Sequence, residues 1–199
     1  MTYQIHRYPA DLIDVVYLGH GERVVIRPVL PQDEDLTLAF FHGLSGSARY
    51  DRFMTSLREV PRDLMRRFTQ VDYANHLALV AEVFGGGRET VVAEARYVRT
   101  GDDGSAAEFA VSVAEPWQGK GLARLLLGKL ACRAGAQGVT RLTGQTLATN
   151  ERMLTLARKA GFTLRPSGEV RGVIELEKWL PAPQPGRLCS GAGPSALAA

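Results

Sequence analysis

Residues 107–123, with the sequence AEFAVSVAEPWQGKGLA, are the most informative part of this chain. The stretch predicts an apolar strand, then a short loop, then a helix whose start is marked by glycines. Gly119 and Gly121 have no Cβ, so a ligand can come close to the backbone there. The positive end of the following helix would face that turn. The stretch therefore indicates a place to hold a pyrophosphate.

Two familiar phosphate-binding motifs do not fit this turn. The P-loop pattern GxxxxGK[ST] is absent, since Lys120 lies between the two glycines. A dinucleotide-binding GxGxxG would need glycine where the chain has Arg124, and no early βαβ unit precedes it. Glycine is also common in ordinary turns, so the turn alone is a weak signal.

A second motif makes the pattern specific. Gln118, Gly121 and Ala123 fit Q-x-x-G-x-[GA], which resembles the acetyl-CoA loop of the Gcn5-related N-acetyltransferase (GNAT) superfamily. Downstream, residues 150–154 (NERML) and then 160–162 (AGF) resemble the second hallmark of that superfamily, a helix that opens with Asn and closes on Gly-Phe. Two hallmarks in the expected order argue against a chance match.

The resemblance implies that acetyl-CoA is the acyl donor and that the turn holds its pyrophosphate. The expected residues of the turn are Gln118, Gly119, Lys120, Gly121, Leu122 and Ala123. Backbone groups of Val111, Ser112 and Val113 are expected to meet the pantetheine amides or the thioester oxygen, as an added strand would. Asn150 is expected to hydrogen-bond the pantetheine arm. The alternatives are core packing for the valines, surface charge for Lys120 and a helix N-cap for Asn150.

Glu108 is the candidate general base. An ammonium group has no lone pair, so acyl transfer to an amine needs a group that removes its proton. In superfamily members that acetylate protein lysines, the strand before the cofactor loop often carries a glutamate, and Glu108 matches that position. We expect a half-buried carboxylate there, which would be a stronger base; a solvated strand-end glutamate is the alternative. Glu94 could face the same cleft or solvent, while Glu115, before Pro116, fits a turn residue better.

The chain departs from the superfamily pattern at the leaving group. Many members carry a tyrosine four residues before the Gly of Gly-Phe, and it protonates the departing thiolate. That position is Ala157, which has no proton to give. Ser112 and water remain as donors.

The amino-terminal half narrows the resemblance to one subgroup. Residues 44–53 and 71–81 look like the acetyltransferase domain of bacterial protein lysine acetyltransferases, which silence acyl-CoA synthetases by acetylating a lysine. We interpret Tyr50, Phe53 and Tyr73 as core or cleft wall, and His76 as a structural histidine. The activity implied is direct transfer to a protein lysine. A small-molecule amine acetyltransferase and a non-catalytic acyl-CoA sensor are the alternatives.

Composition sets the broader expectations. Twenty-four basic residues against 21 acidic give a net charge of +3, which predicts no nucleic-acid partner. No apolar run is long enough to span a bilayer and no signal peptide is evident, so we expect a cytoplasmic protein without a membrane partner. Cys132 and Cys189 suggest neither a disulfide framework nor a zinc site, and we expect no metal.

The element pattern predicts a mixed α/β (α+β) fold, in which a mostly antiparallel sheet has helices on both faces. Strands are predicted over 15–18, 23–27, 76–84, 90–99, 107–114, 140–147, 162–165 and 171–179. Helices are predicted over 31–41, 48–57, 61–69, 122–136 and 150–160. The resemblance implies a GNAT fold in which strands 107–114 and 140–147 splay apart for acetyl-CoA. We expect an N-terminal extension with the first hairpin strand (1–21), the acetyltransferase domain (22–180) and a disordered tail (181–199).

Overall fold

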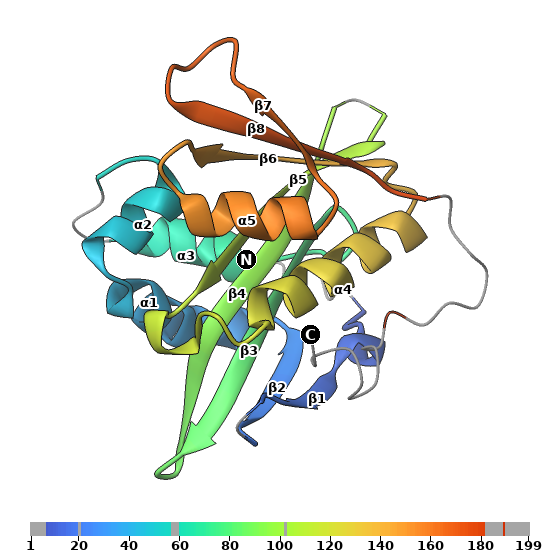
Figure 1. Cartoon of the computed structure of the whole chain (residues 1–199). Helices are drawn as coiled ribbons and strands as arrows, with labels where there is room; N and C mark the ends of the chain where they lie inside the picture. The colour runs from blue at the N-terminus through green and yellow to red at the C-terminus, as the bar shows by residue number, and fades with distance from the viewer. Residues whose placement is uncertain (1–6, 20, 57–59, 102, 182–188, 190–199) are drawn as a thin grey trace.

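The computed structural model describes residues 7–19, 21–56, 60–101, 103–181 and 189. Its centre is one eight-stranded sheet with the order β1-β2-β3-β4-β5-β6-β8-β7 (Figure 1). The strands are β1 (Asp14–Tyr17), β2 (Arg23–Pro28), β3 (His76–Gly85), β4 (Arg88–Thr100), β5 (Ala106–Val113), β6 (Arg141–Leu147), β7 (Thr163–Pro166) and β8 (Val173–Trp179). All neighbouring pairs are antiparallel except β5 and β6, which are parallel.

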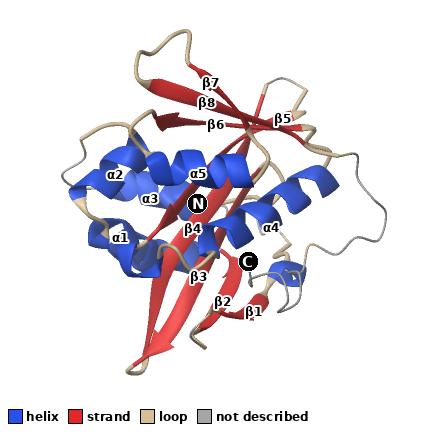
Figure 2. Ribbon diagram, in the orientation of Figure 1, coloured by secondary structure: helices blue, strands red, loops and turns tan. Residues whose placement is uncertain are grey.

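Helices cover both faces of this sheet (Figure 2). They are α1 (Glu34–Gly43), α2 (Gly46–Phe53), α3 (Arg62–Thr69), α4 (Leu122–Ala136) and α5 (Glu151–Lys159). Three short 3-10 turns are η1 (Ala10–Leu12), η2 (Pro31–Asp33) and η3 (Glu115–Trp117). α4 packs on β3, β4 and β5 and, with α5, crosses in front of the strands in Figure 1. α1 packs on β4, and α2 contacts β5 and β6.

Local sequence explains the best-defined elements. β3 and β4 form a hairpin around Gly86 and Gly87, whose φ angles of 57° and 75° suit a tight turn that other residues adopt with strain. On α4, Leu122, Leu126 and Leu130 recur every fourth residue and are 0–1% exposed, so one side of the helix is in the core. The predicted fold class is confirmed.

β5 and β6 pair over only part of their length. Their ladder joins Ala106 to Arg141, Ala107 to Leu142 and Glu108 to Thr143, and ends there among the described residues. The antiparallel pairing of β5 with β4, in contrast, continues to Val113. The second half of β5 therefore has a partner on one side and an open edge on the other. This is the splayed arrangement that the resemblance implies.

The cysteine expectation is wrong. Cys132 on α4 is half-buried and forms a disulfide with Cys189, 57 residues further along the chain. Apart from Pro181 and Cys189, the predicted tail lies outside the described residues, as do residues 1–6 of the predicted extension. Within the described part of the chain, no helix has the length and apolar character needed to cross a membrane. The same part contains no cluster of three or more His, Cys, Asp or Glu side chains suited to a metal ion.

Candidate active site

A large cavity, about 1860 Å³ in volume, lies around the open edge of β5. Its lining includes residues from both faces of β5, together with parts of α2, α4, α5 and β6. All ten residues expected to contact the cofactor line it: Val111, Ser112, Val113, Gln118, Gly119, Lys120, Gly121, Leu122, Ala123 and Asn150. Positions separated by as many as 39 residues in sequence thus meet around one space.

The open edge of β5 presents main-chain groups to this cavity. Just before the strand, the carbonyl oxygen of Ser105 accepts a 2.8 Å hydrogen bond from the N–H of Thr140, so odd-numbered residues direct their polar groups toward β6. Val111 and Val113 follow with the same orientation, beyond the end of the β5–β6 ladder. The carbonyl oxygen of Val113 accepts a 2.9 Å hydrogen bond from Nε2 of Gln118. The gap is therefore suited to a ligand with amides of its own.

The turn before α4 has the backbone form that its glycines predict. Gly119 and Gly121 have φ angles of 75° and 83°, in the left-handed region that favours glycine. A Cβ added to Gly119 would meet no other atom within 4 Å, so there is open space beside the turn. α4 begins directly afterwards at Leu122, which places the N-terminal end of a 15-residue helix at the turn. An anion would find backbone N–H donors here.

Two side chains of the turn already have partners within the protein. The Oε1 atom of Gln118 accepts a hydrogen bond from Arg152 on α5, so this glutamine links the turn to α5. The ammonium group of Lys120 forms an ion pair with Glu22 and lies 4.7 Å from the centre of the Trp117 ring. These contacts connect the loop to α5, to Glu22 and to Trp117.

Two further expected residues have structural roles. Oδ1 of Asn150 accepts a 3.0 Å hydrogen bond from the N–H of Met153, so Asn150 caps α5 while it also lines the cavity. Leu122 is 1% exposed, which places its side chain in the core and leaves its backbone as the part available to a ligand.

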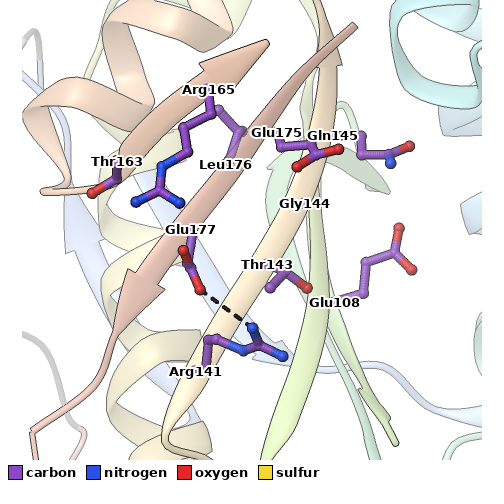
Figure 3. Close-up of a pocket in the computed structure, with 10 residues that line it drawn as sticks. All are labelled: Glu108, Arg141, Thr143, Gly144, Gln145, Thr163, Arg165, Glu175, Leu176 and Glu177. Carbon is purple, nitrogen blue, oxygen red and sulfur yellow. Dashed lines mark hydrogen bonds and ion pairs between the residues drawn. The ribbon is translucent and has the colours of Figure 1, made fainter. Parts of the chain in front are cut away.

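Glu108 lies beside a second, smaller cavity of about 410 Å³ (Figure 3). It is exposed, so the expectation of a half-buried carboxylate is wrong. The strand register aligns Glu108 with Thr143 on β6, Glu177 on β8 and Thr163 on β7, all on one face of the sheet. The smaller cavity lies along these four residues. Gln145 on β6 lines both cavities, and through it Glu108 adjoins the larger one.

The carboxylates of Glu94 and Glu115, the two other candidate residues, form contacts with other parts of the protein. Glu94 is 0% exposed and accepts a 2.5 Å hydrogen bond from Nε of Arg96, which excludes a free carboxylate in solvent. Glu115 accepts a 3.1 Å hydrogen bond from the N–H of Ser45, and this bond lowers the pKa of Glu115. Among the three glutamates, Glu108 alone lines the smaller cavity, and it is free of these structural contacts.

Sequence reasoning missed a buried hydroxyl in the larger cavity. Thr146 on β6 is 2% exposed, and its Oγ1 has no hydrogen-bond partner among the described residues. Ala157, at the position of the expected tyrosine, is fully buried. A lone threonine in a strand carries no sequence signal, so Thr146 could be found only from the structure.

Sequence reasoning also missed the burial of Arg52. This arginine belongs to the segment 44–53, and its side chain lines the larger cavity and is only 12% exposed. The position of an arginine two residues after Tyr50 gives no indication that it will be buried.

Comparison with known proteins agrees with this geometry. The family model described as "Acetyltransferase (GNAT) domain" matches residues 23–163. The chain is 36% identical over 146 residues to "Acetyltransferase Pat" of Mycolicibacterium smegmatis, covering 73% of this chain and 43% of that protein. It is 30% identical over 145 residues to "Acetyltransferase PA5475" of Pseudomonas aeruginosa, covering 73% of this chain and 77% of that protein.

A solved structure gives the same result. The crystal structure of the GNAT domain of S. lividans PAT matches with a TM-score of 0.79 at 29% identity, over 87% of this chain and 100% of that chain. This chain spans less than half the length of the mycobacterial Pat protein, so its similarity to that relative concerns the acetyltransferase part. The chain belongs to the GNAT family, as a Pat-like acetyltransferase.

Proposed function

We propose that this protein transfers an acetyl group from acetyl-CoA directly to the ε-amine of a protein lysine, with Glu108 as general base. The observation that carries the proposal is the convergence of all ten expected cofactor residues on one cavity, next to an exposed glutamate. The resemblance of residues 44–53 and 71–81 to bacterial protein lysine acetyltransferases supports a protein acceptor, for which an acyl-CoA synthetase is one example.

Each part of acetyl-CoA matches a different region of the larger cavity. The pyrophosphate would lie at the turn between Gly119 and Gly121, where backbone N–H groups and the helix end attract an anion. The pantetheine arm would run along the open edge of β5, pairing with backbone groups of Val111. Its thioester would then reach the gap between β5 and β6, near Gln145.

The chemistry then needs few protein groups. Glu108, directly or through a water molecule, takes a proton from the acceptor ammonium, and the amine lone pair attacks the thioester carbonyl carbon. A C–N bond forms and the C–S bond breaks; the nitrogen loses its second proton to water, water protonates the departing sulfur, and coenzyme A leaves as the thiol. Backbone N–H donors at the open edge of β5 stabilise the oxyanion. No covalent intermediate on the enzyme is involved.

The exchange Glu108→Gln tests the base. It removes the basic oxygen and keeps the size of the side chain, so kcat should fall about 10²–10⁴-fold while affinity for acetyl-CoA is kept. Glu175→Gln is the matched control, because Glu175 is another exposed glutamate on the smaller cavity, and it should leave kcat nearly unchanged. Near-normal turnover by Glu108→Gln would reject the assignment.

The acceptor class needs a separate experiment. Labelled acetyl-CoA is incubated with the protein and a cell extract, and the products are fractionated by size. Label on a protein band is expected. Label on small molecules alone would favour a small-molecule amine acetyltransferase, and donor binding without turnover would favour a sensor.

A further inference from the structure

Thr146 on β6 has a buried hydroxyl for which the described residues offer no hydrogen bond. The residue is 2% exposed, and its Oγ1 has no partner in the part of the chain that the structure describes. Such a hydroxyl has given up its hydrogen bonds to water and gained none in return, which costs stability. Thr146 also lines the larger cavity. A molecule bound in that cavity can therefore supply the missing partner.

The strand register places Thr146 across the gap from Val111. The ladder between β5 and β6 pairs Ala106 with Arg141 and keeps the same offset of 35 residues to its end. The same offset beyond the ladder sets Val111 opposite Thr146. The other edge of β6 is occupied there, because Thr146 pairs with Ile174 of β8. Thr146 thus borders the gap in which we place the pantetheine arm and the thioester.

The side chain of Thr146 belongs to the donor side of this gap. Thr143 and Gln145 line the smaller cavity, and Figure 3 shows their side chains beside it. Successive side chains of a strand alternate between its faces, so Thr146 lies on the face opposite to that of Gln145. In agreement, Thr146 lines the larger cavity and is absent from the lining of the smaller one. The hydroxyl is therefore placed to meet the acyl donor rather than the acceptor.

One developing charge in the proposed reaction still lacks a protein group. Glu108 takes the proton of the amine, and backbone N–H groups of β5 meet the oxyanion. The sulfur gains an electron pair as the C–S bond breaks, and no residue has been assigned to it. Ala157, at the position of the tyrosine that many superfamily members carry, is fully buried and has no hydroxyl. A hydrogen-bond donor aimed at this sulfur would lower the barrier.

The shape of a thioester directs its sulfur toward β6. Oxygen and sulfur lie on different sides of the carbonyl carbon, so an oxygen that faces the N–H groups of β5 leaves the sulfur facing the opposite strand. Gln145 and Thr146 are the residues of β6 that line the larger cavity, and Gln145 is exposed. Ser112, which the sequence offered as a donor, is half-buried and lies on β5 itself. The buried hydroxyl of Thr146 is shielded from water, which strengthens a hydrogen bond.

We propose that Thr146 is a catalytic residue whose Oγ1 donates a hydrogen bond to the sulfur of the acyl donor as the C–S bond breaks. The electron pair of that bond passes to the sulfur, the threonine keeps its own proton, and water supplies the proton that makes coenzyme A a thiol. This rests on the proposed acetyl transfer from acetyl-CoA and is independent of the role of Glu108. A neutral thioester sulfur is a weak acceptor and a thiolate a strong one, so the contact favours the transition state over the bound donor.

The exchange Thr146→Val tests this role, because it removes the hydroxyl and keeps the shape of the side chain. Transfer of label from saturating acetyl-CoA to the protein fraction of a cell extract measures turnover, and calorimetric titration measures the affinity for acetyl-CoA. Turnover should fall about 10–100-fold, the loss of one hydrogen bond to a charged group, while the affinity stays within about twofold. Thr146→Ser retains the hydroxyl and should keep most of the turnover.

Thr37→Val is the matched control. Thr37 on α1 is also fully buried, and its Oγ1 also lacks a partner among the described residues, but it lines neither cavity. The same exchange there should leave turnover and donor affinity unchanged. Both valine variants should melt at or above the wild-type temperature, because each loses a buried hydroxyl without a partner. A lower melting temperature of Thr146→Val alone would reveal a structural partner and overturn the proposal.

Free coenzyme A gives a readout apart from turnover. At a pH where its thiol is ionised, Thr146→Val should bind coenzyme A about tenfold more weakly than the wild type does, and should bind desulfo-coenzyme A, which has no sulfur, equally well. Equal binding of both ligands together with normal turnover would overturn the role of Thr146 and leave the acetyltransferase intact.

Two other results have separate meanings. A lower affinity of Thr146→Val for acetyl-CoA with turnover kept would place the hydroxyl on a pantetheine amide, and would overturn its assignment to the sulfur. A wild-type protein that does not bind acetyl-CoA at all would overturn the proposed function, and the role of Thr146 with it.

Discussion

Glu108 and Phe109 are neighbours in sequence, but their side chains lie on opposite faces of β5. Glu108 is exposed beside the smaller cavity, whereas Phe109 is 4% exposed and its ring centre lies 4.8 Å from that of Phe162. The alternation of a strand produces this separation. One residue can therefore serve the reaction while the next holds the layers together.

His76 gives a prediction at the same scale. Burial, and then the charge of Arg96, lower its pKa to about 4, against about 6.5 for an unfolded histidine. The folded protein keeps His76 neutral while the unfolded chain takes up a proton, so stability is complete above pH 6.5 and falls as the pH drops toward 4. The loss at the acid end should be at most about 3 kcal/mol.

Urea unfolding at several pH values, in the wild type and in His76→Gln, measures this contribution. The wild type should lose more stability than the variant between pH 6.5 and pH 4.5, since the variant has no group to titrate there. Parallel pH dependence in the two proteins would show that His76 plays no part.

The limits of sequence reasoning are clear from single residues. Gln118 and Asn150 could be placed because each belongs to a motif with fixed spacing. Arg52 and Thr146 could not, because burial of a polar side chain depends on which elements pack over it. The exposure of Glu108 also depends on which elements pack over β5. Local patterns carry no such information.

At the scale of elements, the predicted ends of a helix agree with the observed ends where the sequence signals are strong. α4 was predicted over 122–136 and is observed at Leu122–Ala136, because its glycine start and leucine spacing are both clear. α2 was predicted over 48–57 but ends at Phe53. Oγ of Ser45 accepts a hydrogen bond from Ala48 and starts the helix earlier, and Met54 takes a φ of 52° that stops it.

The contact between β5 and β6 gives an element-scale prediction. A Cβ on Gly144 of β6 would lie 2.8 Å from Cε1 of Phe109, a distance too short for real atoms. Gly144→Ala should therefore displace the ring or the strand and lower the free energy of unfolding by roughly 1–3 kcal/mol. Denaturant unfolding measures the change.

The matched control lies on α4. Gly128→Ala places the new Cβ where no atom lies within 4 Å, so it should stabilise the helix by about 0.5–1 kcal/mol. If Gly144→Ala were as stable as the wild type, Phe109 would have room that the structure does not show.

At the scale of the whole molecule, the disulfide connects Cys189, near the C-terminus, to Cys132 on α4. It closes a segment with a sequence separation of 57, which contains β6, α5, β7 and β8. The sequence could not reveal the pairing, because Cys189 follows a segment rich in proline and glycine that gives no signal for its position.

Loss of this bond should lower stability. Cross-linking a loop of this length restricts the unfolded chain and contributes about 2–4 kcal/mol. Cys132→Ser should lower the free energy of unfolding by that amount, and a reducing agent should do the same to the wild type but not to the variant. Identical unfolding of the wild type with and without reductant would contradict the bond.

Gln145 lines both the larger and the smaller cavity, and this has a consequence for the order in which substrates bind and products leave. If acetyl-CoA enters beside α4 and the lysine arrives over β6 and β8, the two substrates reach the active site through separate entrances. A bulky acetylated protein then does not obstruct the departure of spent coenzyme A, and a fresh donor can be loaded while that protein is still attached.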